Sequence, residues 1–280
     1  MKLWVITRLT VREAQRRKLL WIALALGVVF VALFAGGFHL IYREFATFSQ
    51  STVGGQVQYQ VVTVFFLTAG LYVINFLAVM MAVLTSVGTV SGEISSHTIQ
   101  SLATKPLRRW EILLGKWVAY SVMLGVYTSI LSLSLVLVVR LISGYIPNNW
   151  LGPIGLLILE GWVILTVSIL GGTFLSTIAN GVLAFMLYGI AFIGGWVEQF
   201  GSLMASDAAV NIGILTSLVL PSEALWRRAS YLMQPAIIRN LPANPFSTAS
   251  VPSPAMVLYA AFYIVALLGI ALWVFSQRDL

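Results

Sequence analysis

The sequence of 280 residues contains no cysteine, few charged residues and very little histidine or aspartate. Without cysteine there can be no disulfide, no thiolate nucleophile and no cysteine-based metal site. The only histidines, His39 and His97, form no H-E-x-x-H zinc motif, and no histidine follows residue 97 to assist a serine protease within the membrane. Asp207 and Asp279 lie outside the middle of any apolar segment, which excludes an intramembrane aspartyl protease.

A nucleotide-binding P-loop is also missing. The Gly115-Lys116 pair is followed by Trp117 instead of serine or threonine, and Trp110 occupies the position of the first P-loop glycine. If the protein uses ATP, another chain must therefore bind it. The sequence shows no internal repeat of the inverted kind that is common in secondary transporters.

Apolar residues dominate what remains. They make up 59% of the chain, charged residues make up 9%, and the mean hydropathy is +0.95. Soluble domains carry roughly 25% charged residues, which cover their surface. These values exclude a soluble enzyme, a disordered chain and a disulfide-rich secreted module. They predict an all-α integral membrane protein, with about six spans of ~20 residues each.

The apolar segments place these spans within a single transmembrane domain, residues 1–280. Polar residues, proline and glycine mark the connections between them, including a turn at Ala179-Asn180-Gly181. The predicted spans are residues 19–42, 61–90, 112–142, 154–178, 182–197 and 256–275.

Basic residues set the expected orientation. Residues 1–18 carry six lysines and arginines interleaved with apolar residues, which predicts an amphipathic helix at the cytoplasmic membrane surface. With six spans and a cytoplasmic N-terminus, 11 of the 16 basic residues lie on the cytoplasmic side. The positive-inside rule therefore favours cytoplasmic termini in a plasma or inner membrane, and it explains the net charge of +7 without a nucleic-acid partner. An additional crossing near residues 210–220 would reverse the C-terminus.

Residues 198–255 differ from the rest of the chain because they hold six of the nine prolines. Residues 210–220 are apolar but too few to cross a bilayer, so they predict a re-entrant or interfacial segment. Ser222 can begin a short helix over residues 223–233, with Glu223 at its positive end. This region is expected to be extracytoplasmic or re-entrant.

The most informative segment is the predicted cytoplasmic loop at residues 91–111. Ser96 or Thr98 could begin a short helix that Pro106 ends, and Ile99 and Leu102 would supply apolar contacts. Such a helix suits docking into a groove on a partner protein. It would equally suit a helix that rests on lipid headgroups, and the residues alone leave both interpretations open.

This loop resembles the coupling region of the membrane subunits of ATP-binding-cassette (ABC) exporters of the ABC-2 permease type. The family pattern is a Glu, a small residue with Thr, an apolar run, a Pro, an Arg and a Gly-Lys pair. In this sequence the pattern falls on Glu93, Thr98, Leu102, Pro106, Arg109, Gly115 and Lys116. The basic N-terminal helix, the six spans and the broken region before the last span are similar as well. His97 departs from the pattern, since many members have glycine there.

The resemblance implies that the loop is a coupling helix, which docks into a separate ATPase subunit that binds ATP and Mg. The residues that would contact the ATPase are Glu93, His97, Thr98, Leu102, Lys105, Pro106 and Arg109. The resemblance also implies two permease chains, as a homodimer or heterodimer, with a substrate path at or beside their interface. The chain itself is expected to hold no cofactor and to catalyse no reaction.

Four polar residues lie within predicted spans. Glu160 and Arg140 are in spans joined by a short loop, so we expect an ion pair that is either structural or part of a substrate contact. Asn75 and Thr68 lie in the second span. Asn75 is a candidate for a hydrogen bond to a neighbouring helix or for the substrate pathway, and Thr68 is a candidate for the substrate pathway.

The sequence therefore predicts the permease subunit of an ABC exporter. One alternative is a membrane subunit that transmits mechanical work to an extracytoplasmic partner without moving a substrate. A second alternative is an ATP-independent secondary transporter, which the missing repeat and the single well-placed intramembrane acid disfavour.

Overall fold

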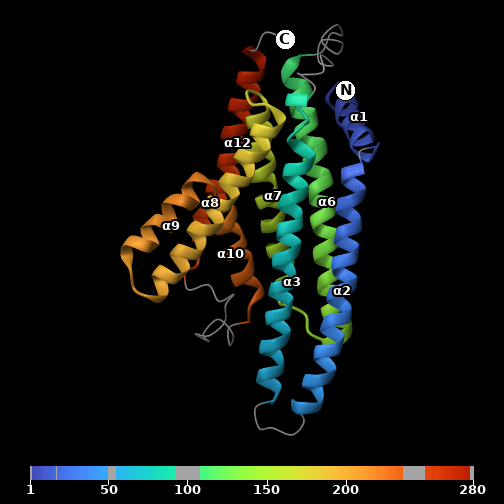
Figure 1. Ribbon diagram of the computed structural model, residues 1–280, viewed down its shortest axis with the longest axis vertical. Helices are drawn as coiled ribbons and strands as arrows, with labels where there is room; N and C mark the ends of the chain where they lie inside the picture. Colours follow the sequence, from blue (N-terminus) through green and yellow to red (C-terminus); the bar gives the residue numbers. More distant parts are fainter. Residues whose placement is uncertain (1, 17, 50–54, 93–107, 236–249, 278–280) are drawn as a thin grey trace.

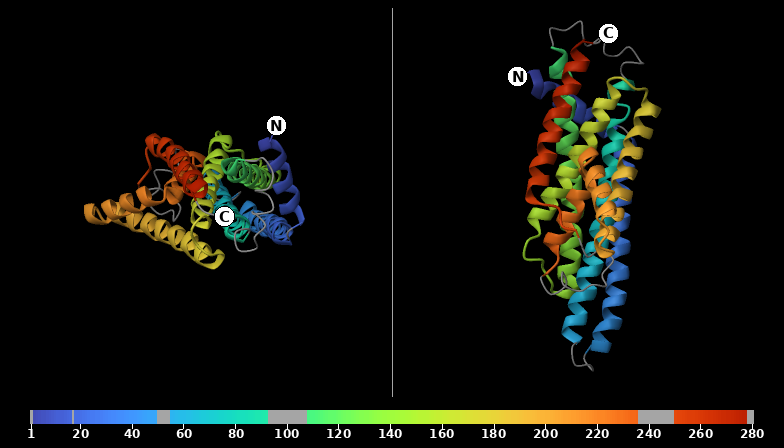
Figure 2. Two further views of the ribbon diagram at one scale, coloured as in Figure 1. Left: turned by 90° about the horizontal axis from the view of Figure 1, so that it is seen from above. Right: turned by 90° about the vertical axis from the view of Figure 1, so that its left-hand side faces the viewer.

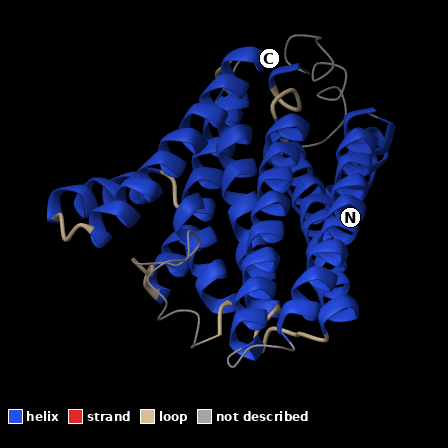
Figure 3. Ribbon diagram, turned by 60° about the horizontal axis from the view of Figure 1, so that its bottom comes forward, coloured by secondary structure: helices blue, strands red, loops and turns tan. Residues whose placement is uncertain are grey.

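The structure, a computed structural model, describes residues 2–16, 18–49, 55–92, 108–235 and 250–277. Within these ranges the chain forms helices and turns and contains no strand (Figure 3). Six of the helices are long and apolar enough to cross a membrane, which confirms the predicted fold class. They are α2 (Lys18–Ser49), α3 (Gly55–Ser86), α6 (Arg109–Ser143), α7 (Leu151–Gly172), α8 (Thr177–Leu203) and α12 (Pro254–Gln277).

The spans pack around α7, which contacts α3, α6, α8 and α12 (Figures 1 and 2). The N-terminal helix α1 (Lys2–Arg16) packs along the first part of α6. It buries Thr7, Thr10 and Ala14 and exposes Arg8 and Arg12, as expected of an amphipathic helix. Figure 1 shows α1, the start of α6 and the end of α12 at the same end of the bundle.

The connection between the fourth and fifth spans differs from the prediction. The helix α7 ends at Gly172, and α8 begins at Thr177 after a turn, so the predicted turn at residues 179–181 is wrong. The Ser176 hydroxyl caps α8 by accepting a hydrogen bond from the backbone N–H of Ala179 at 3.4 Å. Asn180 lies inside the helix and donates from Nδ2 to the carbonyl of Ser168 at 2.8 Å. This buried bond stabilises a helical conformation at a position that would otherwise suit a turn.

Two short helices precede the last span, where the sequence predicts short or re-entrant segments. They are α9 (Asp207–Val219) and α10 (Ser222–Met233), and they meet at an angle of 107°. At 13 residues α9 is about 20 Å long, which is too short to cross a bilayer. It runs back along α8, so that the two form a helical hairpin beside the main bundle (Figures 1 and 2).

Glycines allow this hairpin to pack closely. A Cβ added to Gly213 of α9 would lie 2.7 Å from the carbonyl oxygen of Gly194 and 2.2 Å from the Cβ of Glu198, both in α8. A Cβ added to Gly195 would lie 2.1 Å from Cγ of Glu223 in α10. Neither position has room for a side chain. The helices can approach this closely because glycine has none.

We expect the Gly213→Ala variant to lose about 1–3 kcal/mol of stability, because the new methyl group meets backbone atoms that cannot rotate away. The measurement is thermal unfolding of the purified chain in mild detergent. Gly189→Ala in α8 is the control, because no atom lies within 4 Å of its added Cβ. A Gly213→Ala variant that melts at the same temperature as Gly189→Ala would show that the close contact does not hold the hairpin.

Candidate functional site

Most of the residues expected to couple to an ATPase fall in the segment 93–107, outside the described residues. These are Glu93, His97, Thr98, Leu102, Lys105 and Pro106. Arg109 is described: it is the first residue of α6 and is partly exposed. Next to it, the backbone N–H of Arg108 donates to Oε2 of Glu111 at 3.0 Å, which caps the start of α6.

Hydrogen bonds join the parts of the chain on either side of this segment. One part ends at Gly92, and the other begins at Arg108. Lys116 of α6 is 5% exposed and donates from Nζ to the carbonyl of Thr89 at 3.2 Å. The Thr7 hydroxyl of α1 donates to the carbonyl of Gly115 at 3.3 Å. The first turns of α6 therefore join α1 to the residues that follow α3.

Further bonds extend this junction to α7 and α8. The Ser91 and Thr177 hydroxyl oxygens are 2.8 Å apart, and Nδ2 of Asn180 donates to the carbonyl of Val87 at 3.4 Å. In α6, Nε1 of Trp117 donates to the Thr166 hydroxyl of α7 at 2.8 Å. We call Thr7, Thr89, Ser91, Lys116 and Asn180 the junction residues. They join the parts of the chain on either side of the segment 93–107 to α1 and α8.

The structure does not bring Arg140 and Glu160 together. Glu160 is 0% exposed, and its Oε1 accepts a hydrogen bond from Nδ2 of Asn75 at 3.0 Å. Arg140 is exposed in the last turn of α6. The loop length indicates that α6 and α7 are neighbours, but the rotation of α7 about its axis decides which helix Glu160 faces, and it faces α3. An Asn75–Glu160 pair thus takes the place of the predicted ion pair.

The two polar residues predicted in the second span have different surroundings. Asn75 bonds to a neighbouring helix, which is one of the two roles considered for it. Thr68 is also buried, but its hydroxyl donates to the carbonyl of Val64 at 2.8 Å, within its own helix. This bond satisfies the hydroxyl locally and gives Thr68 no link to another span.

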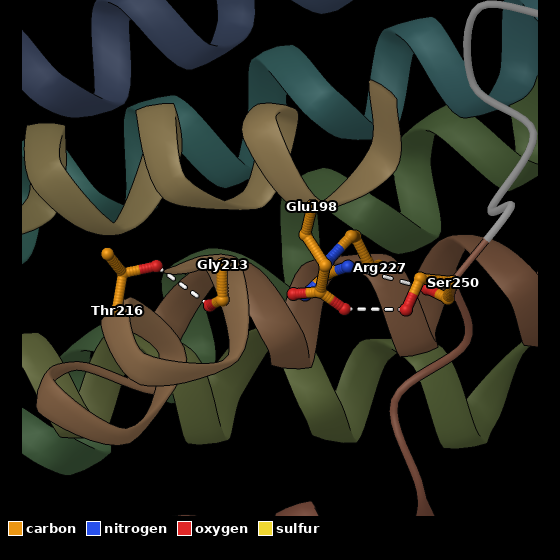
Figure 4. Close-up of polar contacts among 5 residues, drawn as sticks. All are labelled: Glu198, Gly213, Thr216, Arg227 and Ser250. Carbon is orange, nitrogen blue, oxygen red and sulfur yellow. Dashed lines mark hydrogen bonds and ion pairs between the residues drawn. The ribbon is translucent and has the colours of Figure 1, made fainter. Parts of the chain in front are cut away.

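A buried ion pair in the region before the last span was not anticipated from the sequence (Figure 4). Nη2 of Arg227 in α10 lies 2.6 Å from Oε2 of Glu198 in α8, and Arg227 is 3% exposed. The Ser250 hydroxyl donates to Oε1 of Glu198 at 2.5 Å, and Nη1 of Arg227 donates to the Ser250 carbonyl at 3.4 Å. The only sequence signals were an acid near the end of the fifth span and two arginines in the following helix.

This ion pair borders a cavity of about 240 Å³. The cavity lies between α8, α9, α10 and the start of α12, with Glu198, Ser217, Arg227 and Met256 in its wall. Among the described residues no group of three or more His, Asp and Glu side chains could hold a metal ion. The ion pair itself joins α8, α10 and the residues that lead into α12.

Arg227→Met should destabilise the chain by about 3–5 kcal/mol, because it leaves the Glu198 carboxylate buried without a cation. Adding Glu198→Gln to this variant should restore part of the loss, since it removes the uncompensated charge. Arg228→Met is the control: Arg228 is the next residue and donates to the carbonyl of Pro252 at 2.7 Å. Thermal unfolding in detergent measures all four proteins. Equal melting temperatures for the Arg227 and Arg228 variants would rule out the ion pair as the stabilising contact.

Comparison with known proteins agrees with this architecture. A family model described as "ABC-2 family transporter protein" matches residues 4–280. No curated protein matches the sequence. The family match includes α1, both flanks of the segment 93–107, all six spans and the short helices before the last one. The chain therefore belongs to the ABC-2 family of transporter proteins and is a multi-pass membrane permease of an ABC transporter.

Proposed function

We propose that the chain is the permease subunit of an exporter driven by a separate ATPase subunit. That subunit would bind ATP with Mg, dock on the segment 93–107 and move it, while the permease performs no covalent chemistry of its own. The observation that carries the proposal is the set of junction residues. They bond the two flanks of the segment to each other and to α1 and α8, and the Trp117–Thr166 bond adds a link to α7.

The junction residues suggest how a movement would spread. Lys116 is the central contact, because its charge is buried and bonded to a backbone carbonyl at the end of the segment that follows α3. Breaking that bond would remove a hydrogen bond from a buried cationic side chain, which is unfavourable. The start of α6 and the end of α3 should therefore move together as one body when the loop is pushed.

The proposed orientation of the chain in the membrane rests on which helices lie at the same end of the bundle. α1, the start of α6 and the end of α12 lie at the same end (Figure 1). The α1 helix exposes Arg8, Arg12 and Arg16 there, together with apolar Trp4 and Leu9. This surface suits anionic headgroups and the cytoplasmic side of a plasma or inner membrane, with both termini inside.

Two permease chains, identical or different, would complete the transporter. The surface of α2 supports this, because it is apolar and largely unburied within one chain: Val28, Val29 and Leu33 are all more than half exposed. A second chain packed there would form part of the substrate path, and lipid would cover the remaining apolar surface.

One observation favours the alternative in which the permease acts on an extracytoplasmic partner. The helices α2 and α3 have 32 residues each, so both are about 48 Å long against a hydrocarbon thickness of about 30 Å. Figure 1 shows the pair extending beyond the other helices at the end opposite α1. A partner could dock on this extension, and an outer protein that co-purifies with the chain would support that function.

The experiment is co-purification with the ATPase encoded nearest to this chain, followed by ATP hydrolysis in liposomes. Arg109→Ala should weaken ATPase binding about tenfold, because it removes from the docking surface a charged contact that contributes about 1–2 kcal/mol of binding free energy. Arg140→Ala is a matched control, because both arginines belong to α6 but Arg140 is exposed at its opposite end. If no ATPase is retained, or if both variants behave alike, the coupling proposal fails.

A further inference from the structure

The Asn75–Glu160 pair contains two polar atoms whose hydrogen bonding is incomplete. Asn75 is 2% exposed and Glu160 is 0% exposed, and one hydrogen bond of 3.0 Å joins Asn75 Nδ2 to Glu160 Oε1. The other oxygens, Oδ1 of Asn75 and Oε2 of Glu160, have no hydrogen-bond partner among the described residues. Buried polar atoms are rarely left in this state, because each costs about 1–3 kcal/mol.

The two unpartnered atoms share one property. An amide oxygen is always an acceptor, and a carboxylate oxygen is an acceptor as well, so neither can bond the other while Glu160 is ionised. A proton on Oε2 converts that atom into a donor, which Oδ1 of Asn75 can accept. The acid and the amide then exchange two hydrogen bonds instead of one. A single proton thus satisfies both atoms and removes a buried negative charge.

Among the residues that the structure describes, no cation is placed to neutralise Glu160 instead. Arg227 is bonded to Glu198, and Lys116 is bonded to the carbonyl of Thr89 at the start of α6. Of the elements packed on α7, α10 contributes Glu223, whose charge acts on Glu160, and α3 and α8 contribute the phenols Tyr72 and Tyr188. Among the described residues α6 and α12 add no charge that acts on Glu160. The ionisable neighbour is therefore another acid, which supplies no positive charge to Glu160.

We propose that Asn75 and Glu160 form a proton-binding site within the membrane, in which Glu160 carries the proton on Oε2 and donates it to Oδ1 of Asn75. Glu198 is also buried, but it has a different set of partners, because Arg227 and Ser250 supply hydrogen bonds to both of its oxygens. The ligand is thus a proton, held by a carboxyl–amide pair that bridges α3 and α7.

The position of the site connects it with the movement of the permease. Asn75 is in α3, whose C-terminal end continues to Gly92 and the segment 93–107, whereas Glu160 is in the central helix α7. Sliding α3 along α7 would separate the amide from the acid and weaken proton binding. This consequence depends on the proposed function, but proton binding itself does not, and it can be measured on the permease without an ATPase.

Infrared spectroscopy of the purified chain in lipid nanodiscs tests the proposal directly. At neutral pH the spectrum should contain the carbonyl stretch of a protonated carboxyl group, and Glu160→Gln should remove that component. Asn75→Leu should shift it to the frequency of a carboxyl with fewer hydrogen bonds. Glu198→Gln is the control and should leave the component in place. A spectrum in which Glu160→Gln changes nothing in this region overturns the proposal.

Thermal unfolding as a function of pH provides a second readout. A glutamine at position 160 retains both hydrogen bonds of the protonated pair, because its amide donates to Oδ1 of Asn75 and accepts from Nδ2. We expect the variant to fold and to melt near the wild type at about pH 4, where the glutamate of the unfolded chain is also largely protonated. As the pH rises above that value, the wild type should lose stability relative to the variant, because the unfolded wild type has released a proton that it must take up again on folding. A variant that fails to fold, or that loses stability relative to the wild type at high pH, would contradict the proposal.

Discussion

In the hydrocarbon of a bilayer every backbone polar group needs a partner inside the protein, since each one left unpaired costs several kcal/mol. This constraint decides where the described part of the chain departs from regular helix. The residues after α3 leave the helical pattern where Lys116 can donate to the Thr89 carbonyl. The turn between α7 and α8 lies beside the same segment, where Asn180 donates to carbonyls of both Val87 and Ser168. Side chains of α6 and α8 therefore supply hydrogen-bond partners to the irregular stretch after α3, which leads in the sequence to the segment that would receive the ATPase.

The same constraint shapes the region before the last span. A helix as short as α9 must end inside the membrane or at its surface, where its last carbonyls lack partners of their own helix. Two tyrosines of α12 supply them: the hydroxyl of Tyr259 donates to the Leu218 carbonyl at 2.6 Å, and that of Tyr263 donates to the Val219 carbonyl at 2.8 Å. Glycine contacts hold the other face of α9 against α8. The helix α9 is thus held on both sides, by α8 and by α12.

The sequence was sufficient for the six spans because apolar length is a direct consequence of bilayer thickness. It was insufficient wherever tertiary contacts chose between local alternatives. Thr173–Ser176 and Ala179–Gly181 both carry turn-forming residues, and only the buried bonds of Asn180 decide between them. The partner of Glu160 depends on the rotation of α7, which no spacing specifies, so Arg140 was expected where Asn75 is found. Glu198 and Arg227 are separated by a turn and a whole helix, so their pairing required the fold.

Two buried glutamates show two ways in which this chain accommodates an acid in apolar surroundings. Glu198 is held by an arginine and a serine, and separating such a pair would expose two charges to hydrocarbon, so the contact resists movement. Glu160 has only an amide for a partner. When protonated, such a pair can separate without creating a charge, so it yields more easily. The Glu198–Arg227 contact joins α8, α10 and the residues before α12. The Asn75–Glu160 contact, which separates more easily, joins α3 to the central helix α7, and α3 leads to the segment 93–107. Movement driven from that segment should therefore be absorbed between α3 and α7, while the hairpin region moves as a rigid body.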